Sequence, residues 1–217
     1  MKIYKNNYIY FIVFVLFWPI YKTYHLLFKN IPEYSIIPLL IPFFTYLIFG
    51  LFFLFLNREH QINSPILIIL CMVCADLLIK TLVFFTKPDI PIWDVCFRIK
   101  YVPNYYHTAI FSLLKIESPF FLMMLFKAIL VALGIYFFTR FYKRISIFID
   151  VALICLLAAM ICGLFDILIF KHTVDYFFMN GYLVYDLKDV YVDIFLCLFI
   201  AYQIDLSIQN RKSKLSS

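Results

Sequence analysis

The sequence predicts an all-α polytopic membrane protein with about six transmembrane helices and a small extracytoplasmic β-hairpin element. Two observations support this fold class. Hydrophobic residues make up 65% of the chain and charged residues only 15%, and the mean hydropathy of +0.93 exceeds what a water-soluble core requires. A spanning helix needs about 20 predominantly apolar residues. Six such runs are present, at residues 8–28, 36–56, 65–85, 119–139, 145–170 and 190–206.

The basic residues predict which loops face the cytoplasm. The first apolar run follows Lys2 and Lys5, but it is long and aromatic and lacks a small-x-small cleavage site, so it is interpreted as a retained anchor. Further basic groups follow the second, fourth and sixth runs: Arg58, then Arg140, Lys143 and Arg144, then Arg211, Lys212 and Lys214. With six spans all these groups share one side, which the positive-inside rule makes cytoplasmic together with both termini. The loops at 86–118 and 171–189 are then outside, although the first also carries basic residues.

Composition argues against two other classes of function. The net charge of +6 comes mostly from helix ends and loops, so it indicates topology and no nucleic-acid partner is expected. The six cysteines lie mostly inside apolar runs, where thiols pack as small hydrophobic groups. Cys71 and Cys74 form a CxxC, but no second pair and no suitably spaced histidine accompany it. The cysteines therefore give little support to a metal site or a disulfide.

The loop at 171–189 contains a hairpin signal. Asn180-Gly181 suits a two-residue type I′ turn, because both residues tolerate a positive φ, and aromatic and β-branched residues flank it. Such a turn would pair Met179 with Tyr182 and, further out, Asp175 with Asp186. The hairpin would hold carboxylates from the ends of the fifth and sixth helices close together.

Ionisable residues at membrane depth are candidates for function. Asp76 and Lys80 stand four residues apart, which is favourable for an ion pair along a helix, and Asp166 lies near the outer end of the fifth run; all three also fit structural roles. Asp175 and Asp189 flank the hairpin, where two neighbouring carboxyl groups tend to share one proton, the condition used by aspartyl proteases. From the residues alone, helix caps or solvated charges are an open alternative.

Residues 71–206 resemble the bacterial lipoprotein signal peptidases, the signal peptidase II family, in the order and spacing of four motifs. Asp76-Leu-Leu-Ile-Lys80 is similar to the family's D-x-x-x-K. Tyr101-Val-Pro-Asn104 followed by Ala109-Ile-Phe-Ser112 is similar to the next loop. Cys162-Gly-Leu-Phe-Asp166 followed by Val174-Asp175 resembles G-N-x-x-D-R and V-D, and Tyr185-Asp-Leu-Lys-Asp189 resembles F-N-x-A-D.

The resemblance implies an aspartyl endopeptidase whose catalytic pair is Asp175 and Asp189. Its substrate is implied to be a membrane-inserted prolipoprotein carrying diacylglycerol on the lipobox cysteine, cut just before that cysteine, with membrane lipid as a second partner. The matching positions imply that five further residues shape the site or contact the substrate: Asp76, Lys80, Asn104, Asp166 and Asp186. The implied location is the bacterial cytoplasmic membrane, and no metal or organic cofactor is implied. The resemblance covers a four-helix domain at 65–208; two additional N-terminal helices at 1–64 lie outside it, and a cytoplasmic tail follows at 209–217.

The chain departs from the family pattern at four positions near these motifs. Gly163 replaces an Asn, Ile167 an Arg, Asp186 an Asn and Lys188 a small residue, and the Asn104 loop is two residues longer. Isoleucine cannot replace the planar donors of arginine. These departures leave open a different peptide substrate, and also a non-catalytic protein of the same fold that binds lipidated or hydrophobic segments; a transporter is a weaker third alternative.

Asp186 has two possible roles. The hairpin register places it opposite Asp175, whereas the family pattern assigns that partnership to Asp189. Because Asp186 stands just before the sixth helix, its simplest role is an N-cap that accepts the backbone N–H of Asp189. Asp189, in the first turn, would then be directed into the site.

Overall fold

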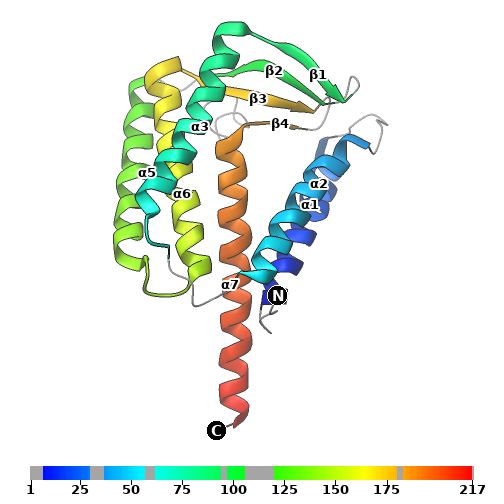
Figure 1. The fold of residues 1–217 in the computed structure, drawn as a ribbon, viewed down its shortest axis with the longest axis vertical. Helices are drawn as coiled ribbons and strands as arrows, with labels where there is room; N and C mark the ends of the chain where they lie inside the picture. Colours follow the sequence, from blue (N-terminus) through cyan, green and yellow to red (C-terminus); the bar gives the residue numbers. More distant parts are fainter. Residues whose placement is uncertain are drawn as a thin grey trace. The chain divides into compact units, whose positions relative to one another are not determined.

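The structure is a computed structural model that describes residues 7–29, 37–56, 62–93, 97–105, 120–179 and 183–216. The chain divides into two compact units. One comprises 1–62, 143–152 and 193–217, and the other comprises 63–142 and 153–192. Figure 1 shows the chain coloured along the sequence.

The described helices follow the predicted apolar runs closely. They are α1 (Asn7–Lys29), α2 (Ile37–Phe55), α3 (Pro65–Thr86), α5 (Phe120–Phe141), α6 (Ile147–Phe165) with its π-helical continuation η1 (Asp166–Phe170), and α7 (Leu187–Ser216). Within the described residues four helices are long and apolar enough to cross a membrane: Pro65–Thr86, Phe120–Phe141, Ile147–Phe170 and Leu187–Arg211. The mostly helical membrane fold is therefore confirmed.

The first two runs form helices, but whether they span stays a prediction. The apolar stretches of α1 and α2 whose side chains the structure describes are the shorter Asn7–Phe17 and Phe43–Phe55. The amide of Asn7 donates to the carbonyls of Phe53 and Leu54, at 3.2 and 3.1 Å, and so binds the end of α2. Tyr10 stacks on Phe148 of α6 within the same unit, with ring centroids 3.8 Å apart.

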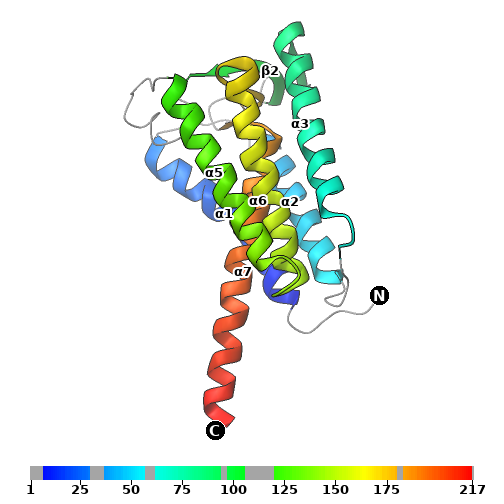
Figure 2. The same ribbon diagram turned by 90° about the vertical axis from the view of Figure 1, so that its left-hand side faces the viewer.

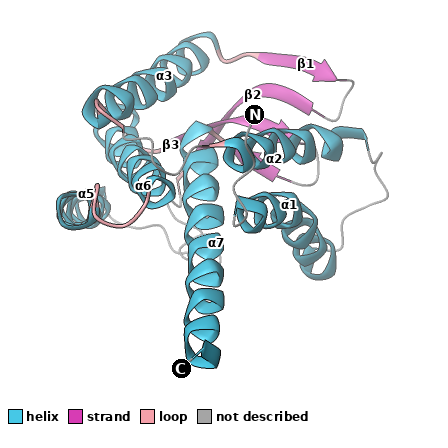
Figure 3. Ribbon diagram, turned by 60° about the horizontal axis from the view of Figure 1, so that its bottom comes forward, coloured by secondary structure: helices cyan, strands magenta, loops and turns pink. Residues whose placement is uncertain are grey.

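A four-stranded antiparallel sheet lies within the second unit, in the order β1–β2–β3–β4 (Figure 3). The strands are β1 (Asp89–Trp93), β2 (Phe97–Asn104), β3 (Thr173–Met179) and β4 (Leu183–Tyr185). The sheet confirms a β element in the loops predicted to be outside, but it is larger than expected. Strands β1 and β2 come from the 86–118 loop, for which no strand was predicted.

The predicted hairpin register is wrong by one residue. Met179 pairs with Leu183, and Phe178 with Val184, so the connection is residues 180–182 and not a two-residue turn. Those three residues, which include the Asn180-Gly181 signal, lie outside the described residues. A one-residue shift exchanges the two faces of a strand. Asp186 consequently follows β4 as the residue before α7 and is not part of the strand ladder opposite Asp175.

Two left-handed residues connect helices to the sheet. Lys87 ends α3 with φ of 44°, and its N–H donates to the Val83 carbonyl at 2.9 Å just before β1. Lys171 ends η1 with φ of 62° just before β3, and its N–H donates to the Ile167 carbonyl. The buried side chains of Val83, Phe170, Val174 and Tyr176 form a common core where the helices meet the sheet.

Within the second unit, α5 runs beside the part of α6 from Leu153 onward (Figure 2). A Cβ on Gly134 of α5 would lie 2.7 Å from the sulfur of Met160 on α6, so the glycine permits this close approach, as small residues do in membrane helix pairs. Most other side chains of α5 are exposed and apolar, which suits a helix surface in contact with lipid.

Candidate active site

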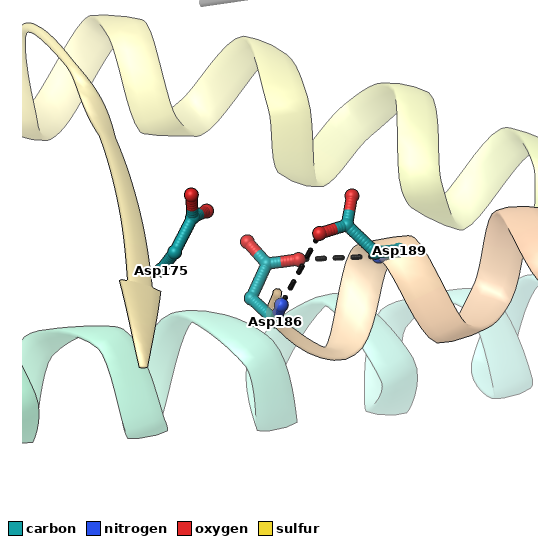
Figure 4. Close-up of side chains that lie close together, drawn as sticks. All are labelled: Asp175, Asp186 and Asp189. Atoms are coloured by element: carbon teal, nitrogen blue, oxygen red, sulfur yellow. Dashed lines mark hydrogen bonds between the residues drawn. The ribbon is translucent and has the colours of Figure 1, made fainter. Parts of the chain in front are cut away.

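Three carboxylates from two elements come together in the second unit (Figure 4). Asp175 lies on β3, opposite Val102 of β2, while Asp186 precedes α7 and Asp189 lies in its first turn. One carboxylate oxygen from each lies within 4.8 Å of the others. The pair predicted from sequence, Asp175 and Asp189, is therefore in close proximity despite the wrong hairpin register.

Asp186 and Asp189 form a reciprocal capping box at the start of α7. The Asp189 N–H donates to Asp186 Oδ1 at 3.1 Å, and the Asp186 N–H donates to Asp189 Oδ2 at 3.2 Å. The expected N-cap role of Asp186 is thus present. The capping box also fixes the Asp189 side chain, because one of its two oxygens is held by a backbone donor.

Lys80 of α3 lies at the centre of a fully buried ion cluster. Its ammonium is 2.8 Å from Asp76, 2.7 Å from Asp166 and 2.8 Å from Asp186, and all four side chains have no exposed surface. Burying a charge is costly unless it is paired, and here one ammonium is paired with carboxylates from α3, η1 and the start of α7. The expected Asp76–Lys80 pair is present, together with two carboxylates that the helical spacing could not predict.

Two neutral donors complete the arrangement. The side-chain amide of Asn104 donates to Asp175 Oδ2 at 3.4 Å, which places this predicted supporting residue beside the carboxylate pair. The Tyr176 hydroxyl donates to Asp76 at 3.5 Å and accepts the N–H of Leu187 at 3.0 Å, so it joins α3 to the start of α7. Tyr176 was not predicted as part of the site.

Sequence reasoning did not assign Lys188 to the site, yet its ammonium lies among the carboxylates. It contacts Asp186 directly, Asp166 at 3.4 Å and Asp175 at 3.7 Å, with only 12% of the side chain exposed. The sequence feature that could have indicated this role is that Lys188 stands where the family pattern has a small residue.

Burial and the neighbouring charges set the pKa values of Asp175 and Asp186. Burial raises the pKa of Asp175 to about 6, and the Lys188 ammonium opposes this rise more than any other neighbour. Burial also acts to raise the pKa of Asp186, but the ammonium groups of Lys188 and Lys80 outweigh it and hold that pKa below its usual range. Asp175 therefore titrates near neutrality while Asp186 remains ionised.

The spacing of the three carboxylates is one that a cation could bridge. The cation that contacts two of them is the chain's own Lys188 ammonium. The carboxylates thus already have a positive partner within the protein, and we assign no metal to them.

Comparison with known proteins identifies the chain. The family model described as signal peptidase (SPase) II matches residues 68–204 of the 217. The chain belongs to the signal peptidase II family. This family is one of proteases, and the match with the apolar helices shows that the chain is a membrane protein.

Two solved structures share the signal peptidase II fold of this chain. Both are described as bacterial membrane enzyme structures obtained by the in meso method, one at 2.3 Å and one at 1.9 Å resolution. The first has a TM-score of 0.57 at 19% identity and covers 69% of this chain and 92% of its own. The second has a TM-score of 0.56 at 20% identity and covers 68% and 97%. No curated protein matches in sequence.

The departures from the signal peptidase II pattern lie around these carboxylates. A Cβ on Gly163 would be 3.3 Å from the Lys127 ammonium of α5, so this lysine approaches the helix where the family carries an asparagine. Ile167 is fully buried and has no side-chain donor to replace the family's arginine. The positive groups near the site are therefore lysines from α3, α5 and α7.

Proposed function

We propose that this chain is an aspartyl endopeptidase that cleaves membrane-inserted precursor peptides, with diacylglyceryl-modified prolipoproteins as the substrate class implied by its family. The observation that carries the proposal is the proximity of the Asp175 and Asp189 carboxylates, supplied by β3 and α7. Their setting is largely buried, and two neighbouring carboxyl groups in such a setting share a proton and perform acid and base chemistry together.

The chemistry follows from one proton on the pair. The ionised carboxylate takes a proton from water as the water oxygen bonds to the scissile carbonyl carbon, while the protonated carboxyl gives its proton to the carbonyl oxygen. In the second step the C–N bond breaks, the leaving nitrogen receives the proton taken from water, and a hydroxyl proton of the diol returns to the other carboxylate. Protons and electron pairs balance, and the pair returns to its initial state.

Cleavage by purified protein is the direct test. A diacylglyceryl-modified precursor peptide should be cut before the modified cysteine, and Asp175→Asn should abolish the product without loss of folded protein. Asp205→Asn is a matched control, because Asp205 lies on the same helix, 16 residues and about 24 Å beyond Asp189 at 1.5 Å per residue. A comparison with the unmodified peptide shows whether the lipid is required.

The site is proposed to face the outside of the bacterial cytoplasmic membrane, with both termini in the cytoplasm. Basic residues around Arg144 and at the end of α7 support this orientation, because the helix ends opposite the carboxylates carry them. A cysteine placed at Arg144 should be labelled only after the membrane is made permeable. Labelling from outside in intact cells would reverse the orientation.

A non-catalytic binding role is the second candidate, and one observation favours it. The Lys188 ammonium contacts Asp175, where it could neutralise the charge that a base requires. Under this alternative the protein would bind the lipidated peptide and release it uncut. Binding without product formation, unchanged in Asp175→Asn, would support the alternative over the peptidase.

A further inference from the structure

Lys188 distinguishes the two members of the proposed pair. Its ammonium lies 3.7 Å from Asp175 Oδ1, and the Asn104 amide donates to the other oxygen of the same carboxyl. Asp189 accepts the neutral backbone N–H of Asp186 and makes no ion pair within 4 Å among the described residues. The Lys188 charge also acts on Asp189, but there the Asp186 carboxylate outweighs it, whereas at Asp175 the Lys188 ammonium outweighs Asp186. An ammonium within about 4–6 Å favours the ionised form of a carboxyl group.

Lys80 acts on Asp175 more weakly than Lys188 does. Its three close partners are Asp76, Asp166 and Asp186, and among the described ion pairs only Lys188 reaches Asp175. The five carboxyl groups of the cluster are Asp76, Asp166, Asp175, Asp186 and Asp189, so one ammonium leaves a large excess of negative charge in a largely buried site. A second ammonium reduces that excess, and Lys188 provides it from α7.

We propose that Lys188 is a positioning residue that sets where the shared proton lies: it holds Asp175 ionised as the general base and leaves the proton on Asp189 as the general acid. The inference rests on the proposed peptidase function and assigns roles within it. It also gives Lys188 a compensating role, because Ile167 supplies no charge next to Asp166, whereas Lys188 reaches that carboxylate at 3.4 Å.

Several other groups act on Asp175 and must be kept constant in any test. They are Asp186 just before α7, Asp189 of α7, Lys80 of α3 and Asn104 of β2. Asp166 of η1, Lys127 of α5 and Asp76 of α3 act on other members of the same cluster. Burial is the largest influence on the Asp175 pKa and raises it, and Lys188 is the strongest of the opposing charges. Removing Lys188 alone should therefore move that pKa upward.

The test is the pH dependence of kcat/KM in wild type, Lys188→Gln and Lys188→Arg. The base must be ionised to act, so loss of the ammonium should shift the acidic limb to higher pH by about one unit. At pH 6 the ionised fraction of Asp175 then falls from about one half to about one tenth, so the rate of Lys188→Gln should be about fivefold below wild type. Lys188→Arg should restore the wild-type limb. Lys100→Gln removes an exposed lysine that pairs with Asp89 and is the matched control.

Two results would overturn the inference. A loss of the same factor at every pH in Lys188→Gln would show a merely structural role. A gain of activity would show that the lysine restrains the pair.

If the wild type cleaves nothing, the proposed function fails, and the titration can still be followed by infrared difference spectroscopy of the carboxyl stretch that Asp175→Asn removes. The midpoint of that stretch should rise by about one pH unit in Lys188→Gln; an unchanged midpoint contradicts the proposal.

Discussion

Asp186 and Asp189 cap each other across the first turn of α7, each carboxylate accepting the backbone N–H of the other residue. Apart from this cap, the two aspartates make different contacts. Asp186 uses its remaining oxygen on the ammonium groups of Lys80 and Lys188, whereas Asp189 keeps one oxygen outside the capping box. The capping box thus orients Asp189 toward Asp175 while Asp186 stays within the ion cluster.

Substitutions at Asp186 and Lys188 should have coupled effects on stability. Asp186→Asn keeps the cap but leaves two lysines with one carboxylate fewer, and Lys188→Ala leaves three carboxylates without this ammonium. The double variant removes one charge of each sign and restores the family pattern at both positions. We expect its loss of stability to be smaller than the sum of the two single losses by about 1–3 kcal/mol, measured by unfolding in detergent. Additive losses would mean that the contact carries no coupling.

Lys80→Met should mainly damage folding. Its loss leaves three fully buried carboxylates without their common ammonium, which costs about 3–5 kcal/mol for breaking a buried pair. Activity per folded molecule should fall less than it does in Asp175→Asn. Thermal unfolding together with cleavage normalised to folded protein measures both effects. Turnover abolished in stably folded Lys80→Met, with Asp175→Asn still active, would reverse the roles assigned to these residues.

Asp175→Asn should change how stability depends on pH. Because the pKa of Asp175 rises from 3.8 to about 6 on folding, the folded protein retains a proton there that the unfolded chain releases. This contribution is fully present below pH 3.8 and is lost as pH rises through about 6. Asparagine has no such proton. The free energy of unfolding of Asp175→Asn, relative to that of wild type, should therefore rise by up to about 3 kcal/mol between pH 4 and pH 7.5. An equal stability difference at both pH values would contradict the shifted pKa.

Tyr46→Phe should weaken the first unit. The Tyr46 hydroxyl of α2 donates to Asp193 of α7, a carboxylate within a membrane-spanning helix. Loss of a hydrogen bond to a charged or buried carboxyl costs about 1.5–3 kcal/mol. Tyr136→Phe, on an exposed tyrosine of α5, is the matched control and should have little effect. Equal stability of the two variants would show that the Tyr46–Asp193 contact contributes nothing.

The sequence predicted the helices well because apolar length alone marks a span. The predicted run at 65–85 became α3 at Pro65–Thr86, and 145–170 became α6 with η1. The sheet was underestimated because Pro91 obscures β1 and because the strand signal of β2 went unrecognised: Arg98 and Lys100 alternate with apolar residues from Phe97 to Tyr101. The register of β3 and β4 depends on residues 180–182, and the Asn180-Gly181 pattern indicated a shorter connection than the ladder shows.

The site residues that lie in short sequence motifs could be predicted, whereas the contacts between elements distant in the sequence could not. Asp175 and Asp189 were found from the order of motifs, and the Asp186 cap from its place before a helix. The contacts of Lys80 with Asp166 and Asp186 join α3 to η1 and α7, so they depend on tertiary packing. Lys188 could be noticed only as an exception to the family pattern, and its contacts required the folded start of α7.

The most direct test of the account is proteolysis by Asp175→Asn, Asp186→Asn and Asp189→Asn, each checked for folding by thermal unfolding in detergent. We expect no cleavage from the Asp175 and Asp189 variants, because each removes half of the acid–base pair. Asp186→Asn should retain cleavage, because asparagine still accepts the Asp189 N–H. Full activity of Asp189→Asn together with its loss in Asp186→Asn would show that Asp186 is the partner of Asp175 and would contradict the central claim.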